Sequence, residues 1–315
     1  MTARDAFLSA TTNTEKSVTN DHLNWLEDEA ISILREVFGS FERPAILCSC
    51  GKDSLVVLHL AMKAALPGKL ALPVVHIDTG HNFPEVIAFR EQLVGKFGLN
   101  LIVGHLDDSI SKGTIRLAHE HESRNPHQTI TLLETIEANR FDAMVGGARR
   151  DEEKARAKER VFSHRDSFGQ WQPRAQRPEL WNLYNTRISR GENFRVFPIS
   201  NWTELDIWNY IARENIELPS IYYTHQRDVV ERNGLLVPVT GITPPRAGET
   251  IVTRDVRFRT VGDISCTCPV ASTASNADEV ILETITATAS ERGATRMDDR
   301  ANDAAMERRK KDGYF

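Results

Sequence analysis

Short apolar runs alternate with helical patterns along residues 21–220, and this alternation constrains the fold more than any other feature. Five runs have the length and composition of buried strands: 45–48, 72–77, 99–103, 141–145 and 195–199. Helical patterns flank them at 21–41, 54–66, 84–97, 129–139 and 204–214. Thr203 is placed to cap the last of these helices. Because strands that alternate with helices form βαβ units, we predict an α/β fold: a mainly parallel five-stranded sheet with helices on both faces.

The two ends of the chain lack this pattern. Residues 1–20 are polar and contain no apolar core of a signal peptide, so we expect a mobile N-terminal tail. From 221 to 315 the periodicity weakens, apart from a strand-like stretch at 251–253 and a helical stretch at about 277–290. We therefore expect three parts: a tail, an α/β domain over 21–220, and an irregular C-terminal extension packed on the core or on a partner.

Composition and charge exclude several classes of function. The 315 residues include 39 Lys and Arg against 44 Asp and Glu, a net charge of -5. This balance argues against broad affinity for nucleic acids or for membrane surfaces. No apolar run approaches the roughly 20 residues that a membrane span needs. We expect a cytoplasmic protein with neither a nucleic-acid nor a membrane partner.

The four cysteines form two Cys-x-Cys pairs, Cys48 with Cys50 and Cys266 with Cys268. Four are too few for a disulfide framework in a chain of this size. If the fold brought the pairs together, they could form a four-thiolate metal site, although the spacing is tighter than in usual zinc sites. The alternative is that they are small residues beside a tight turn and in a loop.

Residues 49–54, Ser-Cys-Gly-Lys-Asp-Ser, follow the first strand and open a helix. Unpaired N–H groups and the helix dipole favour an anion there, Gly51 admits a phosphate close to the backbone, and Lys52 adds positive charge. A Walker A loop would need Gly in place of Ile46 and Ser or Thr in place of Asp53. Asp53 would repel a phosphate unless it holds magnesium or caps the helix. The alternative for the whole segment is an ordinary strand-to-helix turn.

Residue types common in ligand sites also follow the second and fourth predicted strands. They are the acidic Asp78, the glycines Gly146 and Gly147, and the arginines Arg149 and Arg150. Ligands of open parallel sheets bind beyond the carboxyl ends of the strands, where these residues fall. An acidic residue there could bind a ribose or a metal, and guanidinium groups suit phosphate or sulfate. The alternatives are an exposed turn at 78–81 and a solvated helix with i,i+4 pairs such as Glu152 with Arg156.

These segments carry a resemblance to a known family. With 76–80, 146–154, 176–181, 195–204, 257–262 and 306–315, the loop at 49–54 makes the chain similar to the small subunits of heterodimeric bacterial sulfate adenylyltransferases. The likeness runs from about residue 21 to the C-terminus. That family belongs to the PAPS-reductase-like branch of the adenine-nucleotide α-hydrolase fold, whose phosphate loop is called a PP-loop.

The resemblance implies that AMP passes from ATP to sulfate, giving adenosine 5′-phosphosulfate and pyrophosphate, the first step of sulfate assimilation. It implies Mg²⁺ with ATP, no redox cofactor, and a large GTPase partner subunit whose GTP hydrolysis drives the equilibrium. We expect Asp53 to hold the metal, and Lys52, Arg149 and Arg150 to act in catalysis. The expected nucleotide-binding residues are Ser49, Gly51, Lys52, Asp53, Ser54, Asp78, Gly146 and Gly147.

Two departures from the family pattern leave alternatives open. Cys50 stands where relatives commonly have Gly or an aliphatic residue, and 266–269 departs from the usual form. A phosphosulfate reductase would need a redox thiol, for which Cys266 and Cys268 are the candidates, but the adjacent cysteine pair and C-terminal cysteine of such reductases are absent. A nucleotide-binding regulatory subunit is the non-enzymatic alternative, and it would show no sulfate-dependent exchange of pyrophosphate into ATP.

Overall fold

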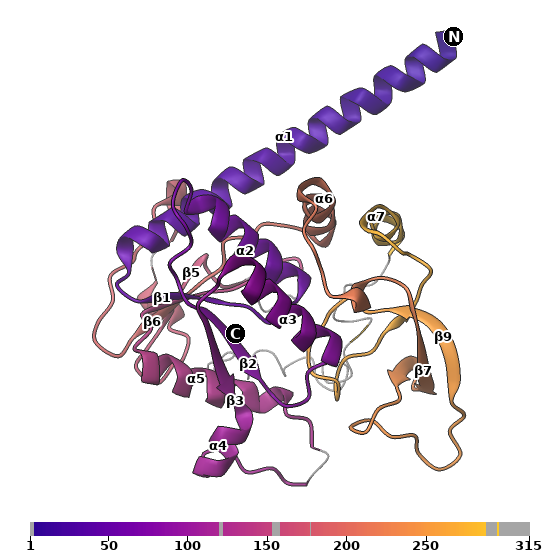
Figure 1. The fold of residues 1–315 in the computed structure, drawn as a ribbon. Helices are drawn as coiled ribbons and strands as arrows, with labels where there is room; N and C mark the ends of the chain where they lie inside the picture. The colour runs from indigo at the N-terminus through magenta and orange to yellow at the C-terminus, as the bar shows by residue number, and fades with distance from the viewer. Residues whose placement is uncertain (1–2, 120–121, 153–157, 177, 288–294, 296–315) are drawn as a thin grey trace.

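The computed structural model describes residues 3–119, 122–152, 158–176, 178–287 and 295, with only the backbone described for 3–19. Six of its strands form one sheet in the order β3-β2-β1-β4-β6-β5 (Figure 1). The first five strands of that order run parallel, and β5 is antiparallel to β6. Their bounds are β1 (Pro44–Leu47), β2 (Val74–Asp78), β3 (Leu101–His105), β4 (Ala143–Val145), β5 (Phe162–Arg165) and β6 (Asn193–Val196).

The prediction of an α/β fold with a mainly parallel sheet is confirmed, but the predicted number of strands is wrong. All five predicted strands are present, and β5 adds a sixth at the edge of the sheet. Its sequence, Phe-Ser-His-Arg, has no apolar alternation, because the buried Ser163 and Arg165 are polar. Hydrogen bonds to Glu159 stabilise these two buried polar side chains. The alternation of apolar and polar residues that marks a strand cannot reveal such bonds.

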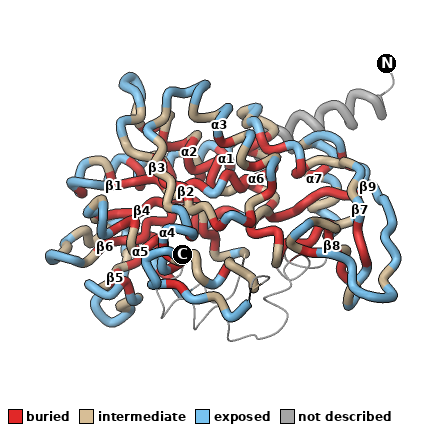
Figure 2. Tube along the Cα trace, turned by 60° about the horizontal axis from the view of Figure 1, so that its bottom comes forward, coloured by how far each residue is buried: buried red, intermediate tan, exposed pale blue. Residues whose placement is uncertain are grey.

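Helices cover both faces of the sheet. The helices are α1 (Ala3–Ser40), α2 (Lys52–Ala64), α3 (Pro84–Phe97), α4 (Leu106–Lys112), α5 (Gln128–Asn139), α6 (Glu204–Glu214) and α7 (Ala277–Thr286). Alternate residues of β1 divide the core: Ile46 packs in one cluster with α1, α2 and α6, whereas Ala45 packs on Leu132 and Ile136 of α5. The central strands β1, β4 and β6 are accordingly buried, whereas much of the outer surface is exposed (Figure 2).

The first helix is longer than expected. We predicted a helix from residue 21 after a mobile tail, but α1 begins at Ala3, and its first part projects away from the sheet (Figure 1). Short 3-10 helices occupy Asn125–His127, Pro173–Ala175, Leu180–Asn182 and Ser220–Tyr222. Within the described ranges, no helix combines the length and hydrophobicity that crossing a bilayer requires.

The irregular C-terminal extension is a wrong prediction, because the region contains a second sheet. Four antiparallel strands pair in the order β10-β9-β7-β8, with the bounds β7 (His225–Arg232), β8 (Leu235–Pro238), β9 (Val252–Arg257) and β10 (Val270–Ala271). Charged residues on the solvent face of β7 and β9 hide the strand pattern. Asn233 and Gly234, both at positive φ between β7 and β8, are the hairpin signal that could have predicted the sheet.

Candidate nucleotide site at the strand ends

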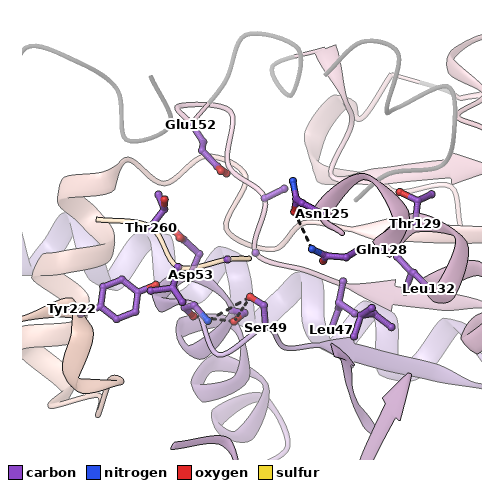
Figure 3. Close-up of a pocket in the computed structure, with 17 residues that line it drawn as sticks. Leu47, Ser49, Asp53, Asn125, Gln128, Thr129, Leu132, Glu152, Tyr222 and Thr260 are labelled. Carbon is purple, nitrogen blue, oxygen red and sulfur yellow. Dashed lines mark hydrogen bonds between the residues drawn. The ribbon is translucent and has the colours of Figure 1, made fainter. Parts of the chain in front are cut away.

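The carboxyl ends of β1 and β4 meet at one edge of the sheet, where a cleft of about 200 Å³ opens (Figure 3). Four parts of the chain that are distant in sequence supply most of its walls: the loop after β1, the turn after β4, residues 125–132 at the start of α5, and residues 260–262. Its lining residues are Leu47, Ser49, Gly51, Asp53, Ser54, Ile77, Asn125, Gln128, Thr129, Leu132, Gly147, Ala148, Glu152, Tyr222, Thr260, Val261 and Gly262.

The loop at 49–54 turns directly into α2. Gly51 is the residue before the helix and has no side chain to cap it, and the Asp53 carboxylate bonds to the side chains of Lys52 and Arg149, so Asp53 is not a cap. The Ser54 hydroxyl donates to the Gly51 carbonyl at 2.9 Å. The Lys52 N–H donates to the Tyr222 hydroxyl at 2.8 Å, which ties the loop to a segment 170 residues away.

The carboxylate of Asp53 lies between two cations. The Lys52 ammonium is 2.9 Å from Oδ2 and the Arg149 Nε is 2.6 Å from Oδ1. The side chains of Lys52 and Arg149 are 1% and 0% exposed, whereas that of Asp53 is 23% exposed and faces the cleft. Burial by itself raises the pKa of Asp53, but the charges of Arg149 and Lys52 outweigh it and lower the pKa below its ordinary value. Asp53 is therefore ionised, and it holds two buried cations at the wall of the cleft.

Gly147 lets the turn after β4 contact this loop. A Cβ atom at Gly147 would lie 3.0 Å from both the carbonyl carbon of Asp53 and the backbone nitrogen of Ser54. Real Cβ atoms are rarely this close to backbone atoms, so any larger residue would separate the two loops. Gly146 extends the pairing of β4 with β6, since its N–H donates to the Val196 carbonyl at 2.9 Å.

The structure brings most of the expected site residues together. Five of them line the cleft: Ser49, Gly51, Asp53, Ser54 and Gly147. Lys52 and Arg149 do not line the cleft themselves, but both form ion pairs with Asp53, which does. Arg150 and Asp78 lie outside the lining: the Arg150 guanidinium bonds to Asn201, and Asp78 accepts from the Gly80 N–H and lies 3.5 Å from Arg90.

Several lining residues were missed by sequence analysis. Leu47, Ile77 and Leu132 form an apolar part of the cleft, and beside it the Gln128 amide donates to Asn125 Oδ1 at 2.9 Å (Figure 3). An apolar surface beside two amides suits a planar, polar-edged ring such as a nucleobase. Nothing in the sequence marks these residues, which read as ordinary core and helix positions. Tyr222 and 260–262 also escaped notice as site residues, although 257–262 carried part of the family resemblance.

The cysteines do not gather at one point. All four are buried and reduced, and the described residues contain no group of three or more His, Cys, Asp or Glu that could hold a metal ion. The four-thiolate site that the spacing left open is therefore absent from this part of the chain. A magnesium ion carried by a nucleotide needs one or two protein carboxylates, and Asp53 supplies one that faces the cleft.

Comparison with known proteins gives the following relatives. Residues 43–269 match the phosphoadenosine phosphosulfate reductase domain family. Sulfate adenylyltransferase subunit 2 of Mycolicibacterium vanbaalenii is 60% identical over 294 residues, which cover 93% of this chain and 94% of that protein. The protein of the same name from Mycobacterium tuberculosis is 59% identical with the same coverage.

Solved structures resemble the chain only distantly. FMN adenylyltransferase of Candida glabrata in complex with ATP has a TM-score of 0.48 and 14% identity, with 89% of each chain covered. Phosphoadenylyl-sulfate reductase of Candida auris, in a phosphate complex, has a TM-score of 0.43 and 14% identity, with 64% of this chain and 89% of that chain covered.

Proposed function

Because the chain belongs to the sulfate adenylyltransferase subunit 2 family, we propose that it is a nucleotidyltransferase that transfers AMP from ATP to sulfate. The products are adenosine 5′-phosphosulfate and pyrophosphate. The observation that carries this proposal is the cleft at the strand ends, where the phosphate-type loop meets Gly147 and the Lys52–Asp53–Arg149 cluster. The four buried thiols disfavour the reductase alternative, since none of them lines that cleft.

In this proposal ATP lies across the strand ends. Its β and γ phosphates bind the loop at 49–54, where the N–H groups at the start of α2 favour an anion. Its adenine ring fits the apolar surface of Leu47, Ile77 and Leu132, with the amides of Asn125 and Gln128 at the polar edge of the base. Asp78, which lies outside the cleft lining, is retained only as a candidate contact to the ribose.

The reaction needs neither a protein nucleophile nor a general base, because sulfate is itself the nucleophile and is fully ionised at neutral pH. A sulfate oxygen attacks the α-phosphorus in line as the bond to pyrophosphate breaks. Phosphate oxygens would compete with Asp53 for Lys52, whose charge would then stabilise the leaving pyrophosphate. Arg149, which is buried against Asp53, and Arg150, which bonds to Asn201, would each rearrange to hold sulfate or the α-phosphate. Holding two reactants in line can lower a barrier by roughly 7–11 kcal/mol.

Magnesium enters as part of the substrate, bound to the phosphates of ATP, with Asp53 as the candidate protein ligand. Its chemical contribution is to neutralise phosphate charge. The other stabilisation in this proposal comes from Lys52, Arg149, Arg150 and the loop N–H groups.

The family name also implies a second subunit. We propose that a large GTPase subunit binds this chain and supplies the free energy that formation of the phosphosulfate anhydride requires. We further propose that the complex acts in the cytoplasm, where ATP and GTP are available.

The test of this function is product formation by the purified complex. The chain and its partner subunit are incubated with labelled sulfate, MgATP, GTP and inorganic pyrophosphatase, which removes one product. We expect labelled adenosine 5′-phosphosulfate that is not formed when ATP is omitted. Labelled sulfite, or no adenylylated product in the complete mixture, would contradict the proposal.

A further inference from the structure

A groove of about 310 Å³ runs along the outer face of α1, on the side away from the core. Trp25, Asp28, Glu29, Ser32 and Glu36 line it, at the spacing that places residues on one helix face. Asn182 and Tyr184 form the other wall. Trp25 leaves 58% of its surface exposed, which is unusual for a tryptophan beside a groove of a folded chain.

The loop beside this groove displays further apolar side chains. Leu180, Trp181 and Leu183 are 58%, 85% and 69% exposed. Trp181 and Asn182 both have left-handed backbone, with φ of 54° and 55°. That conformation is unfavourable for a bulky residue such as tryptophan, yet it places the indole ring in solvent rather than in the core. A contiguous set of exposed aromatic and aliphatic side chains marks an interaction surface.

The groove is lined by the carboxylates of Asp28, Glu29 and Glu36 and by no Lys or Arg, although the charge of the nearby Arg150 acts to lower the pKa of Tyr184. Among the described residues, no Lys or Arg forms an ion pair with Asp28, Glu29 or Glu36. Burial raises the pKa of Tyr184 to about 12, and the negative charge of Glu29 contributes to the shift. An occupant that brings positive charge together with an apolar contact would therefore complement this groove.

We propose that this surface, Trp25 to Glu36 of α1 with 180–184, is the docking site for a basic segment of the large partner subunit. This proposal rests on the proposed function, because the large partner subunit is itself part of that proposal. The Glu29 carboxylate accepts from the Asn201 amide at 3.1 Å, and Asn201 bonds to Arg150. Arg150 adjoins Arg149, which holds Asp53 in the cleft. The docked partner would thus lie next to the residues that bind the reactants.

A second groove offers a matched comparison. It lies between α2, α3 and the end of α6, is lined by Leu58, Met62 and Phe97 among others, and has a volume of about 340 Å³. Its charged residues already pair with one another, Lys63 with Glu214 and Lys96 with Glu217. It therefore presents no unmatched charge to a partner.

The experiment measures the affinity of the full-length chain for the large subunit by sedimentation, in three variants. Trp181→Ser removes the exposed indole, and the double variant Asp28→Lys with Glu36→Lys reverses the charge of the groove. Phe97→Ser, in the second groove, is the control. We expect the first two to weaken binding by about tenfold or more, and the control to change it by less than about twofold. All four altered side chains are exposed enough that folding, checked by thermal melting, should persist.

Equal affinity in all variants, selective loss in Phe97→Ser, or no complex with the wild-type chain would overturn the docking site. Sulfate-dependent exchange of pyrophosphate into ATP is measured on the same preparations. Selective loss of binding without any wild-type exchange would uphold the surface and refute the proposed function, so the two failures are distinguishable.

Discussion

Lys52 has its ammonium group buried against Asp53, at the point where the loop at 49–54 turns into α2. Removing one donor to a transition state typically costs about 3–4 kcal/mol. Lys52→Ala should therefore slow pyrophosphate release by about two to three decades, measured with the partner subunit present. Lys63→Ala on the same helix is the control, since Lys63 pairs with Glu214 outside the cleft and should affect stability more than turnover. Near-normal release by Lys52→Ala would refute its assigned role.

A substitution at Gly147 tests the close packing of the two loops rather than the charges of the cleft. In Gly147→Ala the new methyl group would lie 3.0 Å from the backbone of the loop at Asp53 and Ser54, so the loops must separate. We expect a rise in the KM for ATP of about tenfold or more, since positioning groups that move by about 1 Å can cost a hundredfold. Gly95→Ala, with open space around the new methyl group on α3, should instead stabilise the fold by about 0.5–1 kcal/mol. The same KM in both variants would contradict the close contact.

The ion pairs of Asp53 predict a pH dependence of stability. The pKa of Asp53 is lower in the folded chain than in the unfolded chain, where it is about 3.9. Its stabilisation is therefore present above about pH 4 and is lost as the pH falls toward the folded pKa. Asp53→Asn should lower the free energy of unfolding by about 3–5 kcal/mol at pH 7, and by less at pH 3.

Urea denaturation at the two pH values measures this difference. Asp255→Asn is the matched control, since Asp255 is exposed on β9, and its effect should be small at both values. A loss in Asp53→Asn that is as large at pH 3 as at pH 7 would argue against the ion pairs.

Among the helices and strands, α6 has a clear local sequence signal, a capping box at its N-terminus. The Thr203 hydroxyl accepts from the Asp206 N–H at 3.1 Å while the Asp206 carboxylate accepts from the Thr203 N–H at 2.9 Å, which confirms the predicted cap. Thr203→Ala should lower the free energy of unfolding by about 1 kcal/mol. Ser40→Ala, which removes only an exposed bond to Glu36, serves as the control in the same urea titration. An equal effect in both would show that the cap contributes little.

The elements that sequence analysis predicted are those whose pattern is local. The helix at 84–97 is bounded by Pro84 and Gly98, and its predicted limits are confirmed. Buried strands such as β1 are runs of apolar residues, so their positions were also close. By contrast, β5 and β7 are stabilised through pairing and distant side-chain bonds, and their own sequences carry polar residues at many positions. The strand-like stretch predicted at 251–253 overlaps β9, but pairing partners are not encoded within a strand, so the second sheet itself was not predicted.

The molecule as a whole assembles its site from separate segments. The loop at 49–54 and the turn at 146–147 were predictable, because each follows a strand and topology brings strand ends together. The contact of Tyr222 with Lys52 joins residues 170 apart and has no sequence signal. The pairing of Asp53 with Arg149 was equally hidden, because Arg149 approaches from the turn after another strand. Sequence analysis thus predicted the loop and the turn that meet at the cleft, but neither the larger part of its lining nor how its charges are paired.

The central claim is that this cleft transfers an adenylyl group to sulfate, and pyrophosphate exchange tests it most directly. The complex of the chain with its partner subunit is mixed with MgATP, GTP and labelled pyrophosphate, with and without sulfate, and the label in ATP is measured. The account predicts label in ATP only when sulfate is present, and a loss of about two to three decades in Lys52→Ala. Exchange that does not require sulfate, or no exchange in its presence, would contradict the account.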